Sequence, residues 1–427
     1  MAPIMAAVMP FTGHVTPVLA VVKALVAAGH DVRCYTGSAF ADRVARAGAR
    51  YVPWRHAPDF DENDLAATFP RLVGRKGLRQ TLLNVTDCAI GTAPAQLADL
   101  AEEHAREPWD VLIGDELSVG SAFAAERFDT PWATIGVLPS YIPADSGPPS
   151  GLGLAPGTGA LTRARDAVLR AITPALSYPL RPPLVRARRT AGLPPSRLRF
   201  DQTVFSPQLV VACGAPLLDF GRADRPARLH FVGEYAAPDP GHAPLPSWWH
   251  DLDGRRVVHV TQGTQNIDPT DLIRPALDAL ADEDALVVAT TGVRGRDRLD
   301  FAVPANARIA GYVPYAELLP RVDVMITNGG WGGTLAALGR GIPLVIAGGD
   351  LDKPEIAARV AWAGAGVNLR TGTPTRDQVA DGYRRVHGDG SYRDAAARVA
   401  AQLHELGGAR RAADLIAGLV AAPSSAR

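Results

Sequence analysis

Two separate stretches of the sequence carry side chains that could move a proton. His14 lies in the stretch Pro-Phe-Thr-Gly-His-Val-Thr-Pro (10–17), directly after an apolar segment, and Asp115 ends a second apolar segment, 110–115. An imidazole can take a proton near neutral pH, and a carboxylate bound to it would fix its tautomer and stabilise the imidazolium. Each residue also has a structural interpretation: His14 as a helix-entry residue satisfied by backbone groups, and Asp115 as the N-cap of a helix over 119–127.

A glycine-rich stretch in the second half could bind an anion. Residues 327–334 read Thr-Asn-Gly-Gly-Trp-Gly-Gly-Thr, directly after an apolar segment and before the helical run 335–339. Backbone N–H groups at the start of a helix, together with the helix dipole, favour an anion such as a diphosphate. The alternative is a tight turn that only packs a helix against a strand. The stretch matches neither GxGxxG nor GxxxxGK[ST], which weakens the dinucleotide and P-loop interpretations.

A third polar stretch, Gly348 to Glu355, places acids and a base at the start of a predicted helix. The Asp352 carboxylate can accept hydrogen bonds and the Lys353 ammonium can donate them, which suits a ligand with several hydroxyls. The alternative is ordinary helix capping by Asp350 and Asp352, with Pro354 near the first helical position.

The composition sets the scale of the elements that must position these residues. The chain has 427 residues, 47% of them hydrophobic and 21% charged. A length near three times the ~150 residues of one domain predicts two large globular domains and excludes a mini-protein or a mainly disordered chain. The 44 basic residues cancel the 44 acidic ones. This balance argues against binding nucleic acid through a broad basic surface, so an anion must be held locally.

Cysteine usage and the apolar segments suggest a cytoplasmic location. The three cysteines, Cys34, Cys88 and Cys213, lie far apart and form no CxxC or Cys/His cluster, so neither a disulfide framework nor a zinc site is indicated. The N-terminus lacks the basic region of a signal peptide, and charge, Gly or Pro interrupts the apolar stretches before they reach ~18 residues. We therefore expect neither export nor membrane spanning.

Alternating strand and helix patterns predict two doubly wound parallel-sheet α/β domains that face each other across a cleft. Expected strands are 4–9, 31–36, 50–54, 110–114, 132–137 and 209–213 in the first half, and 257–261, 285–290, 307–310, 322–327, 344–347 and 366–369 in the second. The domains are predicted at 1–235 and 236–407, with a helix at about 408–422 that could pack back on the first domain. Irregular stretches at 55–77 and 138–159 are candidate substrate loops.

The order of these motifs resembles the nucleotide-sugar-dependent glycosyltransferases of family 1, which have the GT-B fold. The resemblance covers nearly the whole chain, and it favours bacterial and fungal enzymes that glycosylate natural products over plant members, because the long plant signature is not reproduced. The matching segments are 13–17 with the following helix, 260–264, 311–314, 318–323, 328–334 and 350–360.

The resemblance implies an inverting transfer of a hexose without a metal or cofactor. His14 would deprotonate a hydroxyl of the acceptor, and Asp115 would orient the His14 imidazole. A UDP- or dTDP-sugar would be the co-substrate, Val313 would meet the nucleobase through its backbone, and Pro314 would shape that slot. Thr334 and backbone groups would hold the diphosphate. The further donor-binding residues that it implies are Gly13, Gly263, Thr264, Gly292, Arg294, Asn328, Gly329, Gly330, Trp331, Gly332, Gly333, Asp352 and Lys353.

Two positions depart from the family pattern. Asn328 stands where many relatives have His, so leaving-group stabilisation must rest more on backbone N–H groups or on arginine. Lys353 replaces the glutamine of the frequent Asp-Gln pair, which leaves the donor sugar open: glucose, another hexose or a deoxysugar.

We expect the acceptor to be a hydrophobic small molecule that is modified at a hydroxyl, with an amine as the second choice. Apolar residues of the two irregular loops and the segment after the first are candidate contacts, namely Phe60, Phe69, Leu83, Tyr141 and Ile142. The alternatives are a nucleotide-sugar 2-epimerase, which needs no acceptor, and a noncatalytic nucleotide-sugar-binding protein. The expected assembly is a monomer or homodimer.

Overall fold

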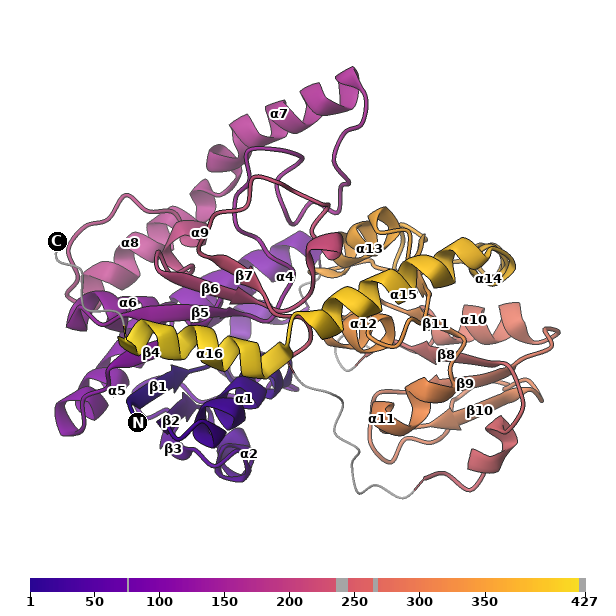
Figure 1. The fold of residues 1–427 in the computed structure, drawn as a ribbon, viewed down its shortest axis with the longest axis horizontal. Helices are drawn as coiled ribbons and strands as arrows, with labels where there is room; N and C mark the ends of the chain where they lie inside the picture. Colours follow the sequence, from indigo (N-terminus) through magenta and orange to yellow (C-terminus); the bar gives the residue numbers. More distant parts are fainter. Residues whose placement is uncertain (75–76, 236–244, 264–267, 422–427) are drawn as a thin grey trace.

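The computed structural model describes residues 1–74, 77–235, 245–263 and 268–421, and it contains two parallel sheets (Figure 1). The first sheet has the order β3-β2-β1-β4-β5-β6-β7 and the second β10-β9-β8-β11-β12-β13. The predicted fold class, two doubly wound α/β domains, is confirmed. The strands are β1 Pro3–Ala7, β2 Asp31–Thr36, β3 Arg50–Pro53, β4 Val111–Asp115, β5 Trp132–Gly136, β6 Leu209–Ala212, β7 Leu229–Phe231, β8 Val257–Thr261, β9 Leu286–Thr290, β10 Ala307–Ala310, β11 Val324–Thr327, β12 Leu344–Ile346 and β13 Gly366–Asn368.

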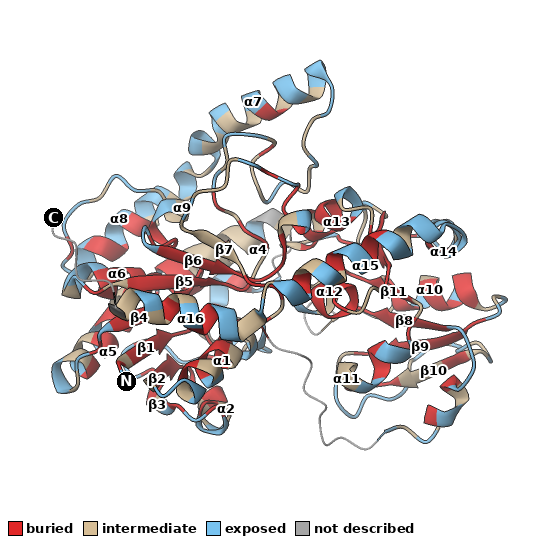
Figure 2. Ribbon diagram, in the orientation of Figure 1, coloured by how far each residue is buried: buried red, intermediate tan, exposed pale blue. Residues whose placement is uncertain are grey.

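Helices cover both faces of each sheet, which explains why the central strands are buried and nearly all apolar (Figure 2). In the first half the α-helices are α1 Thr12–Ala27, α2 Ala41–Arg46, α3 Leu65–Thr68, α4 Gly77–Leu83, α5 Ala93–Arg106, α6 Val119–Phe128, α7 Ala160–Leu176, α8 Arg181–Thr190 and α9 Phe200–Thr203. In the second half they are α10 Ile273–Leu280, α11 Tyr315–Leu318, α12 Trp331–Leu338, α13 Lys353–Trp362, α14 Arg376–Gly388, α15 Gly390–Glu405 and α16 Gly408–Ala421.

The strand order of each sheet reverses direction at one place, and this places the polar motifs. β1 lies between β2 and β4, with Ala7 beside Gly114, and β8 lies between β9 and β11, with Thr261 beside Thr327. Ligands of open α/β sheets bind beyond the carboxyl ends of the strands at such a point. The loops after β1 and β4, and those after β8 and β11, therefore lie at the two predicted ligand-binding edges.

Parts of the fold differ from the regular pattern that the sequence predicts. The first helix begins at Thr12, earlier than its apolar pattern indicates, and contains Pro17. A 3₁₀ turn at Tyr178–Leu180 separates α7 from α8, where prolines remove backbone donors. The first sheet does not end at β6, because β7 adds a short edge strand, and short helices interrupt the stretch 55–77.

The two halves of the chain share a continuous apolar core. α16 lies against α1, beside β4 and β6 of the first sheet (Figure 1). The predicted boundary near Tyr235 falls between the last strand of the first sheet and the first strand of the second, and residues 236–244, which follow it, lie outside the described ranges. One buried cluster includes Val18 and Leu25 of α1 together with Leu335 of α12 and Ile416 of α16.

Candidate active site

His14 and Asp115 meet at the carboxyl edge of the first sheet. His14 lies in the first turn of α1 and Asp115 is the last residue of β4. The distance from His14 Nδ1 to Asp115 Oδ1 is 3.0 Å. Asp115 also accepts backbone N–H bonds from Met9 at 2.6 Å and Leu117 at 2.7 Å, which fix the orientation of the carboxylate. Its N-cap interpretation is wrong, since Ser118 occupies the N-cap position of α6.

The surroundings of His14 shift its acid–base equilibrium in two directions. Burial is the largest single effect and disfavours the imidazolium, but the charge and hydrogen bond of Asp115, together with the charges of Glu116 and Asp352, raise the pKa of His14 above its usual value. With the Nδ1 proton donated to Asp115, Nε2 carries the lone pair that can accept a proton. His14 thus has the arrangement of a general base that is oriented by a carboxylate.

Glu116 is a third ionisable residue at this edge, and the sequence analysis did not identify it. Its carboxylate accepts from the backbone N–H of Val137 at 2.9 and 3.0 Å and of Leu138 at 2.7 Å. Burial raises the pKa of Glu116 to about 7, although the charge of His14 and the backbone bonds oppose this shift. Its position directly after Asp115 at a strand end was the signal available in the sequence.

The glycine-rich stretch forms the turn between β11 and α12. Gly329 has φ +90° and Gly330 is the N-cap residue, so the first-turn N–H groups of Trp331, Gly332 and Gly333 have no partner within the helix. The Asn328 side chain donates to the carbonyl of Gln262 in the loop after β8. Asn328 therefore links the two loops at the switch point of the second sheet.

Asp352 and Lys353 lie at the start of α13 and face the same space as His14. Burial raises the pKa of Asp352, while the charges of Lys353 and His14 lower it. The charge of His14 in the first domain therefore acts on Asp352 in the second. Lys353 Nζ lies 2.7 Å from Asp350 Oδ1. The Lys353 ammonium is therefore partly neutralised by Asp350.

A cavity of about 1690 Å³ joins these motifs and is lined by both domains. Its wall includes most of the predicted donor-binding residues, namely Gly13, Gly263, Gly292, Arg294, Val313, Asn328, Gly330, Trp331, Gly332, Gly333, Asp352 and Lys353, together with His14 and Glu116. Arg294 places its guanidinium carbon 4.3 Å from the centre of the Tyr312 ring, beside Val313. Thr264 lies outside the described residues.

Three predicted donor residues are not on the described cavity wall. Pro314 is the N-cap residue of α11, and Gly329 packs against Ile346. Thr334 is fully buried, and its hydroxyl has no hydrogen-bond partner among the described residues. The diphosphate contact implied for the Thr334 side chain would therefore need a rearrangement, whereas its neighbours Trp331, Gly332 and Gly333 line the cavity.

Of the predicted acceptor residues, Tyr141 lies on the cavity wall. Phe60, Phe69, Leu83 and Ile142 lie instead in the buried core of the first domain, which corrects the expectation of direct contact. Their apolar side chains are held by packing: the Phe60 ring, for example, lies 5.1 Å from the Phe11 ring, and Phe11 itself faces the cavity. The apolar wall is supplied by other residues, including Phe11, Val85, Leu117, Val137, Leu138, Leu180, Phe200, Val204 and Phe205.

Across the part of the chain that the structure describes, His, Cys, Asp and Glu side chains do not gather in groups of three or more that could hold a metal ion. Within the same ranges, none of the helices combines the length and hydropathy needed to cross a bilayer.

Comparison with known proteins decides the family. Residues 274–406 match the model of the erythromycin biosynthesis protein CIII-like C-terminal domain. The chain is 38% identical to 4'-demethylrebeccamycin synthase of Lentzea aerocolonigenes, over 98% of this chain and 99% of that protein. The chain belongs to the family 1 natural-product glycosyltransferases.

Two more comparisons agree with the assignment of this chain to the glycosyltransferases. It is 34% identical to UDP-glucosyltransferase B1 of Starmerella bombicola, over 94% of this chain and 95% of that protein. The solved glycosyltransferase of kitacinnamycin superposes with a TM-score of 0.75 at 21% identity, covering 98% of this chain and 99% of that one, which shows the shared GT-B fold. The comparisons therefore favour an enzyme that transfers sugars over the two alternatives, an epimerase and a noncatalytic binding protein.

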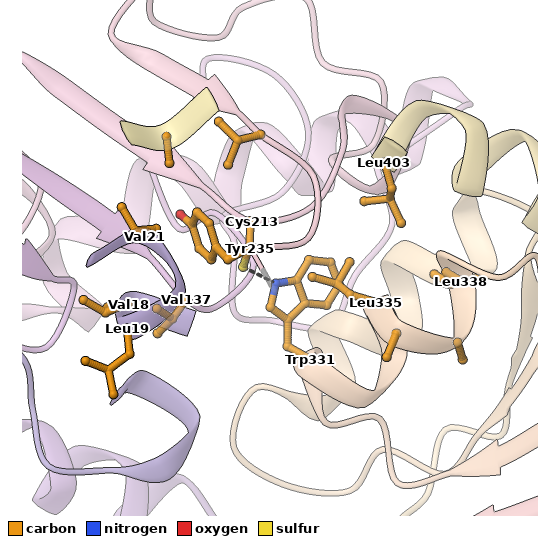
Figure 3. Close-up of a cluster of buried hydrophobic side chains, with 14 of the residues drawn as sticks. Val18, Leu19, Val21, Val137, Cys213, Tyr235, Trp331, Leu335, Leu338 and Leu403 are labelled. Carbon is orange, nitrogen blue, oxygen red and sulfur yellow. Dashed lines mark hydrogen bonds between the residues drawn. The ribbon is translucent and has the colours of Figure 1, made fainter. Parts of the chain in front are cut away.

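The glycosyltransferase also uses its glycine-rich stretch to join its domains. Trp331 points from α12 into an apolar cluster, and its indole N–H donates to the Cys213 sulfur at 3.0 Å (Figure 3). We call this group the interdomain cluster; its members are Val18, Leu19, Val21, Val137, Cys213, Tyr235, Trp331, Leu335, Leu338 and Leu403. Sequence reasoning assigned Trp331 to the donor, but most of its side chain is buried against the first domain, at 5% exposure.

Proposed function

We propose that this glycosyltransferase moves a hexose from a UDP- or dTDP-sugar to a hydroxyl of a hydrophobic small molecule, with inversion at the anomeric carbon. The observation that carries the proposal is the His14–Asp115 pair at 3.0 Å, on the wall of a cavity that the glycine-rich stretch also lines. Acid–base chemistry and an anion-binding helix start thus share one space, as transfer from a nucleotide sugar requires.

In the proposed reaction the acceptor oxygen attacks the anomeric carbon from the side opposite the nucleotide. The acceptor O–H bond breaks and its proton passes to His14 Nε2, while the new C–O bond forms. The bond between the anomeric carbon and the diphosphate breaks, and the nucleoside diphosphate leaves with the electron pair. Asp115 holds the imidazole ring and stabilises the positive charge that it gains.

The departing diphosphate would be stabilised by the start of α12. The N–H groups of Trp331, Gly332 and Gly333 carry the positive end of the helix dipole, which stabilises negative charge. Asn328 adds no formal charge, and its amide already donates to Gln262. We therefore propose that backbone groups, without a metal ion, supply most of this stabilisation.

The acceptor would occupy the first-domain part of the cavity. Aromatic and aliphatic side chains such as Phe11, Tyr141 and Phe200 dominate its wall there, which favours an apolar molecule with few polar groups. The Starmerella relative is a UDP-glucosyltransferase, which supports a UDP-sugar as the donor. Lys353 in place of the family glutamine leaves the identity of the sugar open. A cytoplasmic location, and a monomer or homodimer, complete the proposal.

A mass-spectrometric screen tests this function. UDP- and dTDP-sugars are incubated with polyphenols, macrolides and aminoglycosides, and one product mass shift identifies both substrates. NMR of the product then gives the anomeric configuration, which should be opposite to that of the donor. Activity should be undiminished in EDTA. Conversion of the nucleotide sugar alone to an epimer, or strict dependence on added Mg²⁺, would contradict the proposal.

A further inference from the structure

Two oppositely charged side chains of α13 are buried where this helix meets the first domain. Glu355 and Arg359 are each 1% exposed, and Arg359 Nε donates to Glu355 Oε1 at 3.0 Å. Removing charges from water is costly unless they are paired and hydrogen-bonded. The remaining partners of these two side chains therefore indicate what the pair holds in place.

Glu355 binds the backbone of the loop 138–159 in the first domain. Its Oε2 accepts from the N–H groups of Gly151 at 3.0 Å and Gly153 at 3.1 Å. A Cβ atom at Gly153 would lie 2.8 Å from Pro354 Cβ, so the loop rests directly on the first turn of α13. The carboxylate thus fixes the loop through main-chain groups.

Arg359 binds the start of the same loop and a neighbouring turn. Its Nη2 donates to the carbonyl of Ser140 at 2.8 Å, and its Nη1 donates to Asp219 Oδ1 at 2.7 Å. The guanidinium carbon also lies 5.0 Å from the centre of the Phe220 ring. One arginine of the second domain is therefore held by several groups of the first domain.

The same helix contributes to the donor side of the cavity. Asp352 and Lys353, at the start of α13, line the cavity, and so do Tyr141, Ser150 and Gly151 of the loop. Glu355 and Arg359 are not among the described lining residues. They connect α13 to the loop without lining the cavity themselves.

We propose that Glu355 and Arg359 are positioning residues that hold the loop 140–153 in a fixed position relative to the donor residues of α13. Because this loop lines the acceptor site, they thereby position that site as well. This inference rests on the proposed function, since it assigns the loop to the acceptor. It follows that a nucleotide bound to the second domain stabilises the loop of the first domain, and that the acceptor site is complete only while the two domains are in contact.

The test variant is E355M/R359M, which replaces both charges by apolar side chains and leaves no lone charge on α13. Asp219 keeps its ion pair with Arg225 at 2.9 Å. The matched control is R33M/E103M, which removes a buried pair at 3.1 Å in the first domain, away from the cavity wall. E355Q, which keeps an oxygen acceptor, is the second variant if the double variant does not fold.

Hydrogen exchange of loop peptides, with and without UDP or dTDP, is the first measurement. In E355M/R359M we expect amides of 148–156 to exchange at least tenfold faster, and to gain no protection from nucleotide, while the nucleotide Kd changes less than threefold. In E355Q we expect about threefold faster exchange. The wild type and the R33M/E103M control should both show nucleotide-dependent protection of the loop.

Acceptor kinetics give the second measurement. At saturating donor we expect the acceptor KM of E355M/R359M to rise at least tenfold, while donor hydrolysis without acceptor stays within threefold of the wild type. Unchanged loop exchange and acceptor KM in a folded variant, or an equal loss of nucleotide and acceptor affinity, would overturn the inference. If the wild type transfers no sugar to any acceptor, the proposed function fails, while the exchange measurement still decides the role of the pair.

Discussion

The Trp331 indole N–H donates to the Cys213 sulfur at 3.0 Å, and this bond joins the first residue of α12 to the residue after β6 (Figure 3). Gly214, with φ +105°, leaves room for the ring, because a Cβ there would lie 2.9 Å from Trp331 Cζ2. The start of the proposed diphosphate site is therefore held by the first domain. Loss of this Trp331 contact should therefore affect donor affinity as well as stability.

We predict that Trp331→Ala lowers the free energy of unfolding by about 3–5 kcal/mol, as removal of a large buried aromatic ring does. Nucleotide affinity should fall as well, because α12 loses its anchor. Trp362→Ala is the matched control, since Trp362 lies on the neighbouring helix α13 and is 41% exposed; it should cost about 1 kcal/mol. Urea unfolding and calorimetric titration with UDP and dTDP check both variants, and equal effects would contradict the anchoring role.

Two glycine substitutions separate backbone strain from ligand exclusion. A Cβ at Gly332 meets nothing within 4 Å, so Gly332→Ala should fold with unchanged or slightly higher stability. Its methyl group would nevertheless occupy the start of α12, and we expect nucleotide affinity to fall about tenfold or more, as titration with UDP and dTDP will show. Normal affinity would place the diphosphate elsewhere.

Gly329→Ala provides the contrast. Gly329 has φ +90°, and a Cβ would lie 2.7 Å from Ile346 Cγ2, so this variant should lose about 1–3 kcal/mol of stability. Thermal unfolding of the two glycine variants side by side measures the difference. If Gly329→Ala were as stable as Gly332→Ala, the described conformation of the loop would be wrong.

Asp115→Asn should change the pH dependence of activity through His14. The base must be neutral, so activity rises with pH through the pKa of His14, which Asp115 raises above the usual value of 6.5. Without the carboxylate charge, burial remains and lowers that pKa, so the acid limb of the kcat/KM profile should move to lower pH. The rate at the plateau should fall about 10²–10⁴-fold. An acid limb that stays in place would show that another group controls it.

Glu116→Gln should alter stability in a pH-dependent way. Burial raises the pKa of Glu116 to about 7, above the usual glutamate pKa of 4.5. Between these two pH values the unfolded chain loses the Glu116 proton more readily than the folded protein does, so the free energy of unfolding falls as the pH rises. Relative to the wild type, the variant should therefore gain about 1–3 kcal/mol between pH 5 and pH 8. Denaturant unfolding at both values checks this, and a constant difference would contradict it.

The periodic features of the fold were predictable from the sequence. Alternating apolar segments give the strands of both sheets, and strand ends placed His14 and Asp115 at one edge. The start of α1 was missed because Gly13 and Pro17 are unusual in a helix interior, although the structure places them there.

Contacts between segments that are distant in the chain leave no pattern in the sequence comparable to the alternating apolar segments. Glu355 and Arg359 look like an ordinary i,i+4 surface pair in the sequence, and their burial depends on a loop about 200 residues away. The same limit applies to Phe60 and Leu83: an apolar side chain in a loop can face the core or the cavity, and the apolar pattern does not distinguish the two.

The turnover of His14→Ala, measured together with donor affinity, decides whether His14 is the general base. Turnover should fall by about 10² or more, while the Kd for UDP or dTDP is unchanged. His30→Ala, beyond the opposite end of α1 and outside the described cavity wall, is the matched control and should turn over normally. Near-normal turnover of His14→Ala would contradict the assignment of His14 as the base.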